Sequence, residues 1–477
     1  MVNELFNSIN SFLAKIIFYD VLPGEGTMPF IVAWLVFGAI FITFRMGFIN
    51  LKLLKHGLSI ILGKYRTKDD KGEISSFQAL TTALSATVGL GNLGGVAIAV
   101  SIGGPGATFW MIFAAFFGMS AKFTEVTLAQ HYRKFSAGKK IMGGPMEYLS
   151  KGFAEKGLTG LGKGLAVFFA IGIILSSLGG GNAFQVSQAL GAAQQEFAFF
   201  KSYPLAFGFI MVLIVGLVII GGIKNIAKVT ERIVPLMLIL YIVVTLWIIL
   251  TNIAVVPDAI KAIVVEAFAP VSVVGGVVGS IIVGFQRSAF SNEAGLGSAS
   301  IAHSTASVKY PIRQGIVALY EPFIDTIVIC SLTALVIIIT GVYNAPEFAD
   351  LVANKNGAAL TIEAFRSQVS WFPSVLSIII TLFAYSTMIS WSYYGERCWS
   401  YLFGEKTAII YKVCFLFFIL LSTIASSSVL LDFADLTFLV IAIPNLIGLY
   451  FLHGKVKELL KEYRIKLKDG SFDKESV

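Results

Sequence analysis

The chain of 477 residues is 56% hydrophobic and only 13% charged, with a mean hydropathy of +0.81. This composition excludes an ordinary soluble protein and is typical of a polypeptide that crosses a membrane many times. The net charge of +8 does not indicate nucleic-acid binding, because the basic residues lie in short loops and a tail beside hydrophobic segments.

The first segment, residues 1–76, is predicted to precede the main membrane region. Residues 1–20 carry two acidic residues around a single lysine, unlike the basic and then apolar pattern of a signal peptide, and favour an interfacial helix. After one span, residues 51–66 alternate apolar and basic side chains. This alternation indicates an amphipathic helix lying on the cytoplasmic leaflet.

Apolar stretches of about 20 residues, long enough to cross a bilayer, recur along the chain. Eleven are predicted, at 28–47, 77–102, 107–130, 163–187, 203–222, 232–252, 271–294, 312–341, 372–396, 407–425 and 430–452. An all-α polytopic membrane protein is therefore expected, with its two termini on opposite sides of the membrane.

Lysine and arginine concentrate in alternate connections between these spans. Of the 36 basic residues, 30 lie in the connections 45–76, 131–163, 223–232, 287–313 and 397–412 and in the tail from 453. Basic loops stay in the cytoplasm, so we expect the N-terminus outside and the C-terminus inside. The long connection 342–370 is then external, and its residues 359–369 are predicted to form a short amphipathic helix.

Residues 77–104 form the most unusual of these spans. Apolar flanks indicate a membrane helix, but six glycines from Gly89 to Gly104 indicate that the helix breaks partway. A break leaves backbone N–H and C=O groups unpaired at membrane depth, which is tolerated only where they line a cavity. In secondary transporters such breaks lie near the midplane and hold an anionic group and a cation.

A second interruption is predicted within 271–297, at the glycines Gly275, Gly276, Gly279 and Gly284. This span and 77–102 each begin a set of five spans and run in opposite directions, so two inverted repeats are expected, 77–252 and 253–452, followed by a cytoplasmic tail, 453–477. Matching interruptions in inverted halves are the best sequence pointer to a transporter's site. The alternative is that the glycines only allow close helix packing.

Motifs of soluble enzymes do not occur in a usable form. The spacing Gly89-x-Gly91-x-x-Gly94 matches a dinucleotide fingerprint, but no strand precedes it. The four histidines do not pair at metal-ligand spacing, and the three cysteines form no C-x-x-C pair. We therefore expect a protein that is not an enzyme and that needs no cofactor.

Five motifs resemble the sodium:alanine (alanine or glycine:cation) symporter family. They are SATVGLGNLGG at 85–95, GGPGATFWMIFAAFFGMSAKFTE at 103–125, MGGPMEYL at 142–149, SNEAGLGSASIAH at 291–303 and WSYYGER at 391–397. The resemblance covers nearly the whole chain. It implies an eleven-helix member of the amino acid–polyamine–cation superfamily, with the leucine-transporter-like (LeuT) 5+5 inverted repeat and one preceding helix.

The resemblance also implies function: sodium-coupled symport of alanine or glycine into the cell by alternating access, across the plasma membrane. The partners implied are the amino acid, co-transported sodium and membrane lipid, with no nucleic acid. A proton-coupled amino acid symporter and a channel remain open as alternatives. A channel would also use glycine-rich carbonyls, but as a repeated filter, and none repeats in this sequence.

A sodium site is implied by the same resemblance. It would be made from carbonyls and hydroxyls of the first broken span and of the span 372–396, namely Ser85, Val88, Ala384, Ser386 and Thr387. Such oxygens are hard ligands of the kind an alkali cation prefers. Met388 stands where similar proteins often carry a second hydroxyl, so Ser386 is the candidate substitute.

A substrate site is implied around the first break. The substrate carboxylate is expected against the amides of Gly89 to Gly91, and its ammonium group against the segment from Ser280 to Phe285. The residues implied are Thr87, Gly89, Leu90, Gly91, Asn92, Asn182, Ser280, Phe285, Thr387 and Trp391. Phe285 and Trp391 are expected to be aromatic walls, which favours alanine, glycine or serine over branched amino acids.

Charged residues at membrane depth are functional candidates. Lys122 and Glu125 stand three residues apart on one predicted helix face, so a pair between them is expected. Glu293 is expected to anchor the inner half of its helix through Arg287 or nearby amides.

Overall fold

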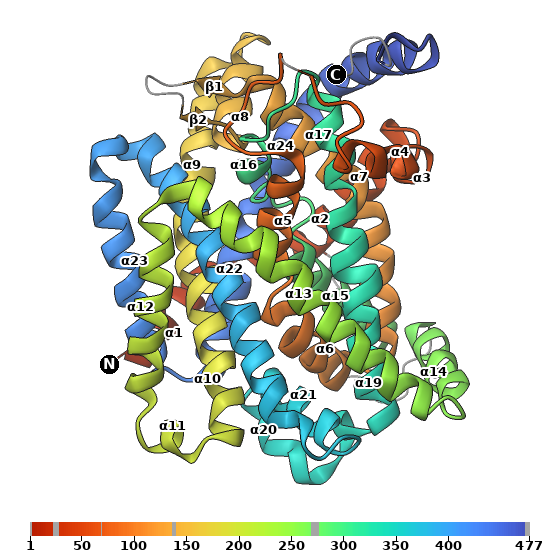
Figure 1. Cartoon of the computed structure of the whole chain (residues 1–477), viewed down its shortest axis with the longest axis vertical. Helices are drawn as coiled ribbons and strands as arrows, with labels where there is room; N and C mark the ends of the chain where they lie inside the picture. Colours follow the sequence, from red (N-terminus) through yellow and green to blue (C-terminus); the bar gives the residue numbers. More distant parts are fainter. Residues whose placement is uncertain (1, 22–27, 68, 136–139, 269–275, 473–477) are drawn as a thin grey trace.

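The computed structural model describes residues 2–21, 28–67, 69–135, 140–268 and 276–472 and is built almost entirely of helices (Figure 1). The described part contains one pair of strands, β1 (Lys134–Phe135) and β2 (Ile141–Met142), which are antiparallel with Lys134 opposite Met142. The predicted helical class is therefore confirmed.

The helices follow one another with short connections. In the first half of the chain they are α1 (Val2–Ile17), α2 (Phe30–Arg45), α3 (Ile49–Lys52), α4 (Leu54–Ile61), α5 (Ser76–Thr87), the π-helical turn η1 (Gly91–Gly95), α6 (Val96–Gly103), α7 (Gly106–Tyr132), α8 (Pro145–Ala154), α9 (Thr159–Leu178), the π-helical turn η2 (Gly179–Ala183), α10 (Phe184–Glu196), α11 (Ala198–Ser202), α12 (Pro204–Ile219) and α13 (Gly222–Thr251).

The second half of the chain has the same character. Its helices are α14 (Val256–Phe268), α15 (Gly276–Asn292), α16 (Ser300–His303), α17 (Pro311–Ala318), α18 (Tyr320–Pro322), the π-helical η3 (Phe323–Cys330), α19 (Ser331–Thr340), the 3-10 turns η4 (Val342–Asn344) and η5 (Pro346–Phe348), α20 (Ala349–Ala353), α21 (Gly357–Arg366), α22 (Phe372–Phe403), the 3-10 turn η6 (Glu405–Thr407), α23 (Ala408–Ser422) and α24 (Ser427–Lys468).

Six helices in the described ranges are long and apolar enough to cross a membrane: Gly106–Tyr132, Thr159–Glu196, Gly222–Thr251, Pro311–Thr340, Phe372–Phe403 and Ser427–Lys468. A seventh span arises if the bent pair Ser76–Thr87 and Gly91–Gly103 is counted as one. Helices also occupy the other predicted ranges, although the first five residues of 271–294 lie outside the described residues. A multi-pass membrane protein is therefore supported, while eleven crossings stay a prediction.

Apolar side chains cover the outer surface of several helices. On α13, Leu236, Ile239, Val243 and Trp247 are each about 60% exposed and recur at helical spacing. By contrast, the stretch from Ala79 to Val100 is buried throughout. The bent pair therefore lies in the centre of the bundle, and the outer helices present apolar side chains at the surface.

The start of α5 is set by a capping box. The hydroxyl of Ser75 accepts from the backbone N–H of Gln78 at 3.1 Å, and the Gln78 side-chain oxygen accepts from the N–H of Ser75 at 3.0 Å. This reciprocal pair satisfies two helix-terminal donors. It defines the start of the central broken helix.

Several predicted peripheral helices are present. The N-terminal helix α1 packs on α24, where Asn10 donates to the carbonyl of Val429 at 3.1 Å. The amphipathic segment 51–66 is helical in part, because α4 ends at Ile61. The predicted helix at 359–369 corresponds to α21. The charged tail is not a separate helix, because α24 continues without a stop through 42 residues.

Candidate functional site

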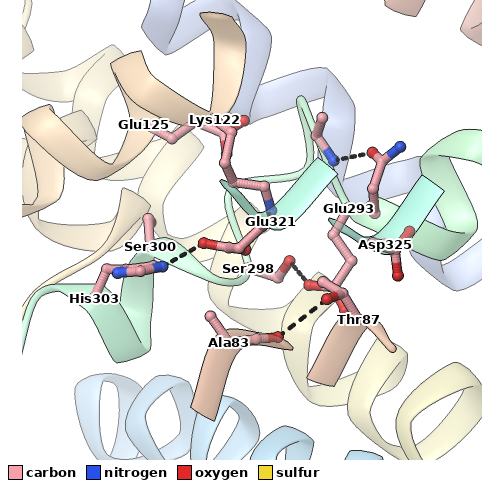
Figure 2. Close-up of polar contacts among 12 residues, drawn as sticks. Ala83, Thr87, Lys122, Glu125, Glu293, Ser298, Ser300, His303, Glu321 and Asp325 are labelled. Carbon is pink, nitrogen blue, oxygen red and sulfur yellow. Dashed lines mark hydrogen bonds and ion pairs between the residues drawn. The ribbon is translucent and has the colours of Figure 1, made fainter. Parts of the chain in front are cut away.

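The first broken helix bends by 50° between α5 and the η1–α6 segment. The α-helical ladder ends at Thr87, and Val88 leaves the helical region with φ −77° and ψ 81°. The predicted break is therefore confirmed at 88–90, between the two halves. Thr87 itself donates its hydroxyl back to the carbonyl of Ala83 at 3.2 Å, as Figure 2 shows.

The amides freed by this break are paired with side-chain oxygens. Gly89 N–H donates to Asn92 Oδ1 at 2.9 Å, and Leu90 N–H donates to Gln185 Oε1 at 3.1 Å. Gln185 comes from α10 and was not among the predicted site residues. These two acceptors lie where an anionic ligand's oxygens are expected, at the start of the outer half-helix.

Glycine is required in the break because other backbones and side chains come close. A Cβ at Gly91 would lie 3.3 Å from the ring of Phe290, and one at Gly94 would lie 2.9 Å from the backbone nitrogen of Ala358. A Cβ at Gly89 would likewise collide with the hydroxyl of Thr387. The glycines therefore let α15, α21 and α22 pack against the broken backbone.

The second break lies later than predicted. Helix α15 is continuous through Gly279 and Gly284, and Gly275 lies outside the described residues. The chain leaves the helix after Asn292, with positive φ at Glu293 (57°), Gly295 (86°) and Gly297 (81°), before α16 begins. This break lies within the predicted range 271–297, but beyond Gly284, because Gly284 serves close packing: a Cβ there would lie 2.8 Å from the carbonyl of Ala107 on α7.

Two of the oxygen atoms predicted to hold sodium, the Ser85 carbonyl and the Thr387 hydroxyl, meet where α5 and α22 touch. Thr387 donates its hydroxyl to the carbonyl of Ser85 at 2.9 Å, and Ser85 donates its own hydroxyl to the carbonyl of Ser386 at 2.6 Å. All three residues are almost completely buried, as are Val88 and Ala384. The hydroxyl of Ser386 instead donates to Phe383 within its own helix. The donor set is neutral, hard and buried, which fits an alkali cation.

A buried carboxylate connects the two breaks. Asp325 Oδ1 accepts from the Asn92 amide at 2.7 Å, and its Oδ2 accepts from the hydroxyls of Ser291 and Thr326, both at 2.7 Å. Within the described ranges no lysine or arginine lies within ion-pair distance of it. Sequence reasoning missed Asp325, although an aspartate inside the apolar span 312–341 was a usable signal.

Aromatic rings stack beside the first break. Trp391 stacks on Phe438 at 4.6 Å between ring centroids, and Phe438 stacks on Phe290 at 4.7 Å. We call these three rings the aromatic stack. Phe285 lies elsewhere, edge-on to Phe113 of α7 at 6.2 Å. Phe290, which was not predicted, is thus the α15 ring that lies against Gly91.

Two other predicted residues have side chains directed away from the break. Asn182 donates its amide to the carbonyl of Phe415 on α23 at 2.7 Å. Ser280 donates its hydroxyl to Gly103 at the far end of α6 at 2.8 Å. The structure therefore brings together Ser85, Gly89, Leu90, Gly91, Asn92 and Thr387, but not Asn182, Ser280 or Phe285.

The buried charges pair differently from expectation. Lys122 lies 3.4 Å from Glu321 of α18 (Figure 2). Glu125 instead accepts from Asn445 at 2.8 Å. Glu293 accepts from the Trp391 indole at 3.0 Å and from Ser298. Arg287 pairs with Asp435 of α24. The expected Lys122–Glu125 and Arg287–Glu293 contacts are wrong because tertiary neighbours are closer than residues along the same helix.

Comparisons with known proteins agree over almost the whole chain. The family model described as the sodium:alanine symporter family matches residues 17–476. The sodium/alanine symporter AgcS of Methanococcus maripaludis is 39% identical over 461 residues, 96% of this chain and 97% of AgcS. The amino-acid carrier protein AlsT of Bacillus subtilis is 33% identical over 471 residues, 98% of this chain and 93% of AlsT.

A solved structure supports the fold. The crystal structure of MhsT in complex with L-phenylalanine matches with a TM-score of 0.51 at 14% sequence identity, covering 80% of this chain and 99% of MhsT. At this identity the match concerns the backbone arrangement alone. It supports the LeuT-type fold that the sequence motifs implied.

Proposed function

This chain belongs to the sodium:alanine symporter family, and we propose that it imports a small neutral amino acid, alanine or glycine, together with sodium. Members of this family are sodium-coupled amino acid symporters, and the chain is a multi-pass membrane protein of that kind. The mechanism proposed is alternating access, in which one central site faces each side of the membrane in turn.

The polar bridge between the two broken helices is the observation that supports this function best. Asn92 beside the first break and Ser291 beside the second both donate to Asp325, and all three residues are buried. A charge and two interrupted backbones at the centre of an apolar bundle are costly unless they bind something. A zwitterionic amino acid and a cation are cargo of matching chemistry.

We assign the sodium ion to the α5–α22 junction. The ligands proposed are the carbonyls of Ser85, Val88 and Ala384 and the hydroxyl of Thr387, with Ser386 as the candidate for a further oxygen. The existing hydrogen bond supports this assignment, because it holds two of the proposed ligands, the Thr387 hydroxyl and the Ser85 carbonyl oxygen, 2.9 Å apart. An ion there would link the central broken helix to α22.

We assign the substrate carboxylate to the amides of Gly89 and Leu90. On binding, it would replace the side-chain oxygens of Asn92 and Gln185, which accept from these amides now. The cationic partner, either the substrate ammonium group or a second sodium ion, is assigned to Asp325. This assignment differs from the expected Ser280–Phe285 segment because those side chains contact α6 and α7.

Counterflow measures this function directly. Proteoliposomes loaded with unlabelled alanine should accumulate labelled alanine in sodium buffer and should fail to do so when choline replaces sodium. The matched control is the same vesicle loaded with leucine. Equal uptake in choline and sodium would contradict sodium coupling, and uptake that never saturates would favour a channel.

We propose eleven spans arranged as one preceding helix, two inverted five-helix repeats at 77–252 and 253–452, and a cytoplasmic tail at 453–477. In Figure 1 the connection between α4 and α5 lies at one end of the molecule, whereas α20 lies at the other. The basic residues gather near the first of these ends, which supports an outside N-terminus and a cytoplasmic C-terminus in the plasma membrane.

A reporter that is active only outside the cytoplasm should test this orientation. Fused after residue 350, it should be active; fused after residue 70, it should be inactive, because that segment belongs to the basic side. Enzymatic activity of both fusions is measured in whole cells. The reverse pattern would overturn the orientation and the inverted pairing of the two repeats.

Selectivity should depend on the aromatic stack. Phe290→Leu removes ring volume against Gly91, so serine, valine and leucine should compete better with labelled alanine. Trp391→Phe should act in the same direction. The matched control is Phe285→Leu, because its ring faces α7 and its loss should leave competition unchanged. If only the Phe285 variant has broadened selectivity, Phe285 rather than Phe290 lines the substrate pocket, as the sequence predicted.

A further inference from the structure

A second group of buried titratable side chains lies next to the proposed transport site and is not used by it. Lys122, Glu125, Glu321 and His303 have no exposed surface, and Glu293 is 1% exposed. They come from α7 and from a distant stretch of the chain that holds the second break, α16 and α18. We call Lys122, Glu321 and His303 the buried triad (Figure 2).

Direct contacts hold the buried triad together. Lys122 Nζ lies 3.4 Å from Glu321 Oε2, and the other oxygen of Glu321 contacts His303 Nε2. On the far side of the imidazole, Gln314 of α17 lies 2.6 Å from Nδ1. Figure 2 shows His303 on one side of the Glu321 carboxylate and Lys122 on the other. Glu321 therefore bridges a permanent cation and a titratable one.

The charges of the cluster do not balance without protons. With a neutral imidazole, one lysine faces the three carboxylates of Glu125, Glu293 and Glu321. Two uncompensated negative charges in a fully buried site are strongly unfavourable. At least one proton must therefore reside in the cluster, and histidine is the side chain whose unperturbed charge change falls between about pH 5 and 8. A proton on the imidazole would cancel one of the two negative charges.

Three other titratable groups face the same cluster. They are Tyr148 of α8, Tyr394 of α22 and Asp325 of η3. Each is neutral or negative, so none supplies a second positive charge. Protonation of His303 would supply one.

Gln314 allows both protonation states of His303. When Nδ1 is unprotonated, the Gln314 amide N–H₂ donates to it; when Nδ1 carries a proton, rotation of the amide presents its oxygen as an acceptor. Gln314 Oε1 has no hydrogen-bond partner among the described residues, although it is buried. The rotation therefore breaks no other hydrogen bond, and the site can exchange a proton without repacking.

The triad is also placed to respond to transport. His303 ends the short inner half-helix α16 of the second broken helix, and Gln130 of α7 donates to its carbonyl. Glu321 stands four residues before Asp325. A movement of α16 relative to α7 as the inner side opens would expose the triad to water.

We propose that the buried triad is a proton-binding site in which His303 exchanges one proton with the cytoplasm during each transport cycle. This rests on the sodium-coupled transport proposed above and adds a second ion to it. The proton moves between His303 Nδ1 and water, with Gln314 as its hydrogen-bond partner. Cytoplasmic pH then sets how readily the inner half of the site closes and returns.

Sodium-dependent alanine uptake should be measured in proteoliposomes with equal internal and external pH, from about 5.5 to 8.5, the range in which histidine titrates. The parent should follow one titration curve. His303→Gln should remain active but lose the pH dependence. His56→Gln is the matched control, because burial and the positive charges of Arg313 and Lys64 lower the pKa of His56 to about 4. His56 stays neutral throughout this range, so its replacement should leave the curve unchanged.

A second variant tests the triad if His303→Gln does not fold. Gln314→Leu removes the acceptor for protonated His303, so the midpoint of the curve should fall by about one pH unit, a tenfold loss of proton affinity. An unchanged midpoint in Gln314→Leu, or an active His303→Gln that keeps the parent curve, would overturn the proposal. A flat pH curve in an active parent would overturn the proton-binding proposal and leave the proposed transport function intact. Absence of sodium-dependent uptake at every pH would instead overturn the proposed function.

Discussion

Asp325→Asn should greatly weaken sodium-dependent alanine uptake while the protein still folds. The substitution keeps the shape of the side chain and removes the negative charge that faces Asn92, Ser291 and Thr326. Removing one partner of a buried charge pair costs about 3–5 kcal/mol. At 1.4 kcal/mol per decade, that is a loss of about two to three and a half powers of ten in affinity for the cation that Asp325 binds.

Two measurements assign the role of Asp325. If it binds a sodium ion, the sodium concentration for half-maximal uptake should rise, while the alanine Michaelis constant at saturating sodium stays near the parent value. If it binds the substrate ammonium group, the Michaelis constant should rise at every sodium concentration. Asp258→Asn, at an exposed position on α14, is the matched control and should behave like the parent.

Parent-like transport by Asp325→Asn would show that transport does not need the negative charge of Asp325. The two breaks would then be joined by neutral hydrogen bonds alone, which asparagine can also make. Melting temperature should be recorded for each variant, because loss of transport with loss of fold would not speak to cation binding. The asparagine variant is expected to be as stable as the parent, since a buried charge is costly to hold.

Thr387→Ala should weaken sodium binding strongly. The hydroxyl of Thr387 meets the Ser85 carbonyl at the α5–α22 junction, so its removal takes away one proposed ligand and leaves the backbone oxygens. Loss of one polar contact in a buried site costs about 1–3 kcal/mol, which is about fivefold to over a hundredfold in sodium affinity. Thr387→Ser keeps the oxygen and should stay close to the parent.

Coupling makes the Thr387 result more informative. Sodium and alanine each stabilise the same closed arrangement of the broken helix and α22, so each should tighten the binding of the other. In Thr387→Ala, the alanine Michaelis constant should therefore rise at low sodium and recover at high sodium. Thr381→Ala, on the same helix with its hydroxyl bonded to Ser377 within α22, is the matched control.

One outcome would contradict the sodium assignment. If Thr387→Ala and the parent have the same half-maximal sodium concentration and the same alanine Michaelis constant, Thr387 is no ligand. The bond between Thr387 and Ser85 would then be a structural link between two helices. Sodium would have to be sought elsewhere, with the surroundings of Asp325 as the first choice.

Composition and local pattern were enough to determine the membrane class and the first break. Apolar length predicts helices in any context, because backbone groups in lipid must pair within their own segment. Four glycines in the seven residues from Gly89 to Gly95 interrupt that pairing whatever the neighbours are. The family motifs extended this to the sodium:alanine symporters, which the comparisons confirmed.

The second break shows where local pattern fails. Glycine in an apolar helix is equally consistent with a break and with close packing, and only the partner helix decides between them. At Gly284 the partner is α7, and the helix continues; at Glu293 a non-glycine residue adopts positive φ and the helix ends. This displacement explains why Phe285 was predicted where Phe290 lies.

By itself, the sequence determined that this protein is helical, lies in a membrane, breaks its central helix near Gly89 and belongs with sodium-coupled carriers. Only the tertiary structure decided that Asp325 joins the two breaks, that Gln185 faces the freed amides, and that Lys122 pairs with Glu321. The physical reason is the distance along the chain between the residues that interact. Helix formation and breaking depend on residues within one turn, whereas the partner of a buried charge is chosen by helices that are distant in the chain and adjacent in space.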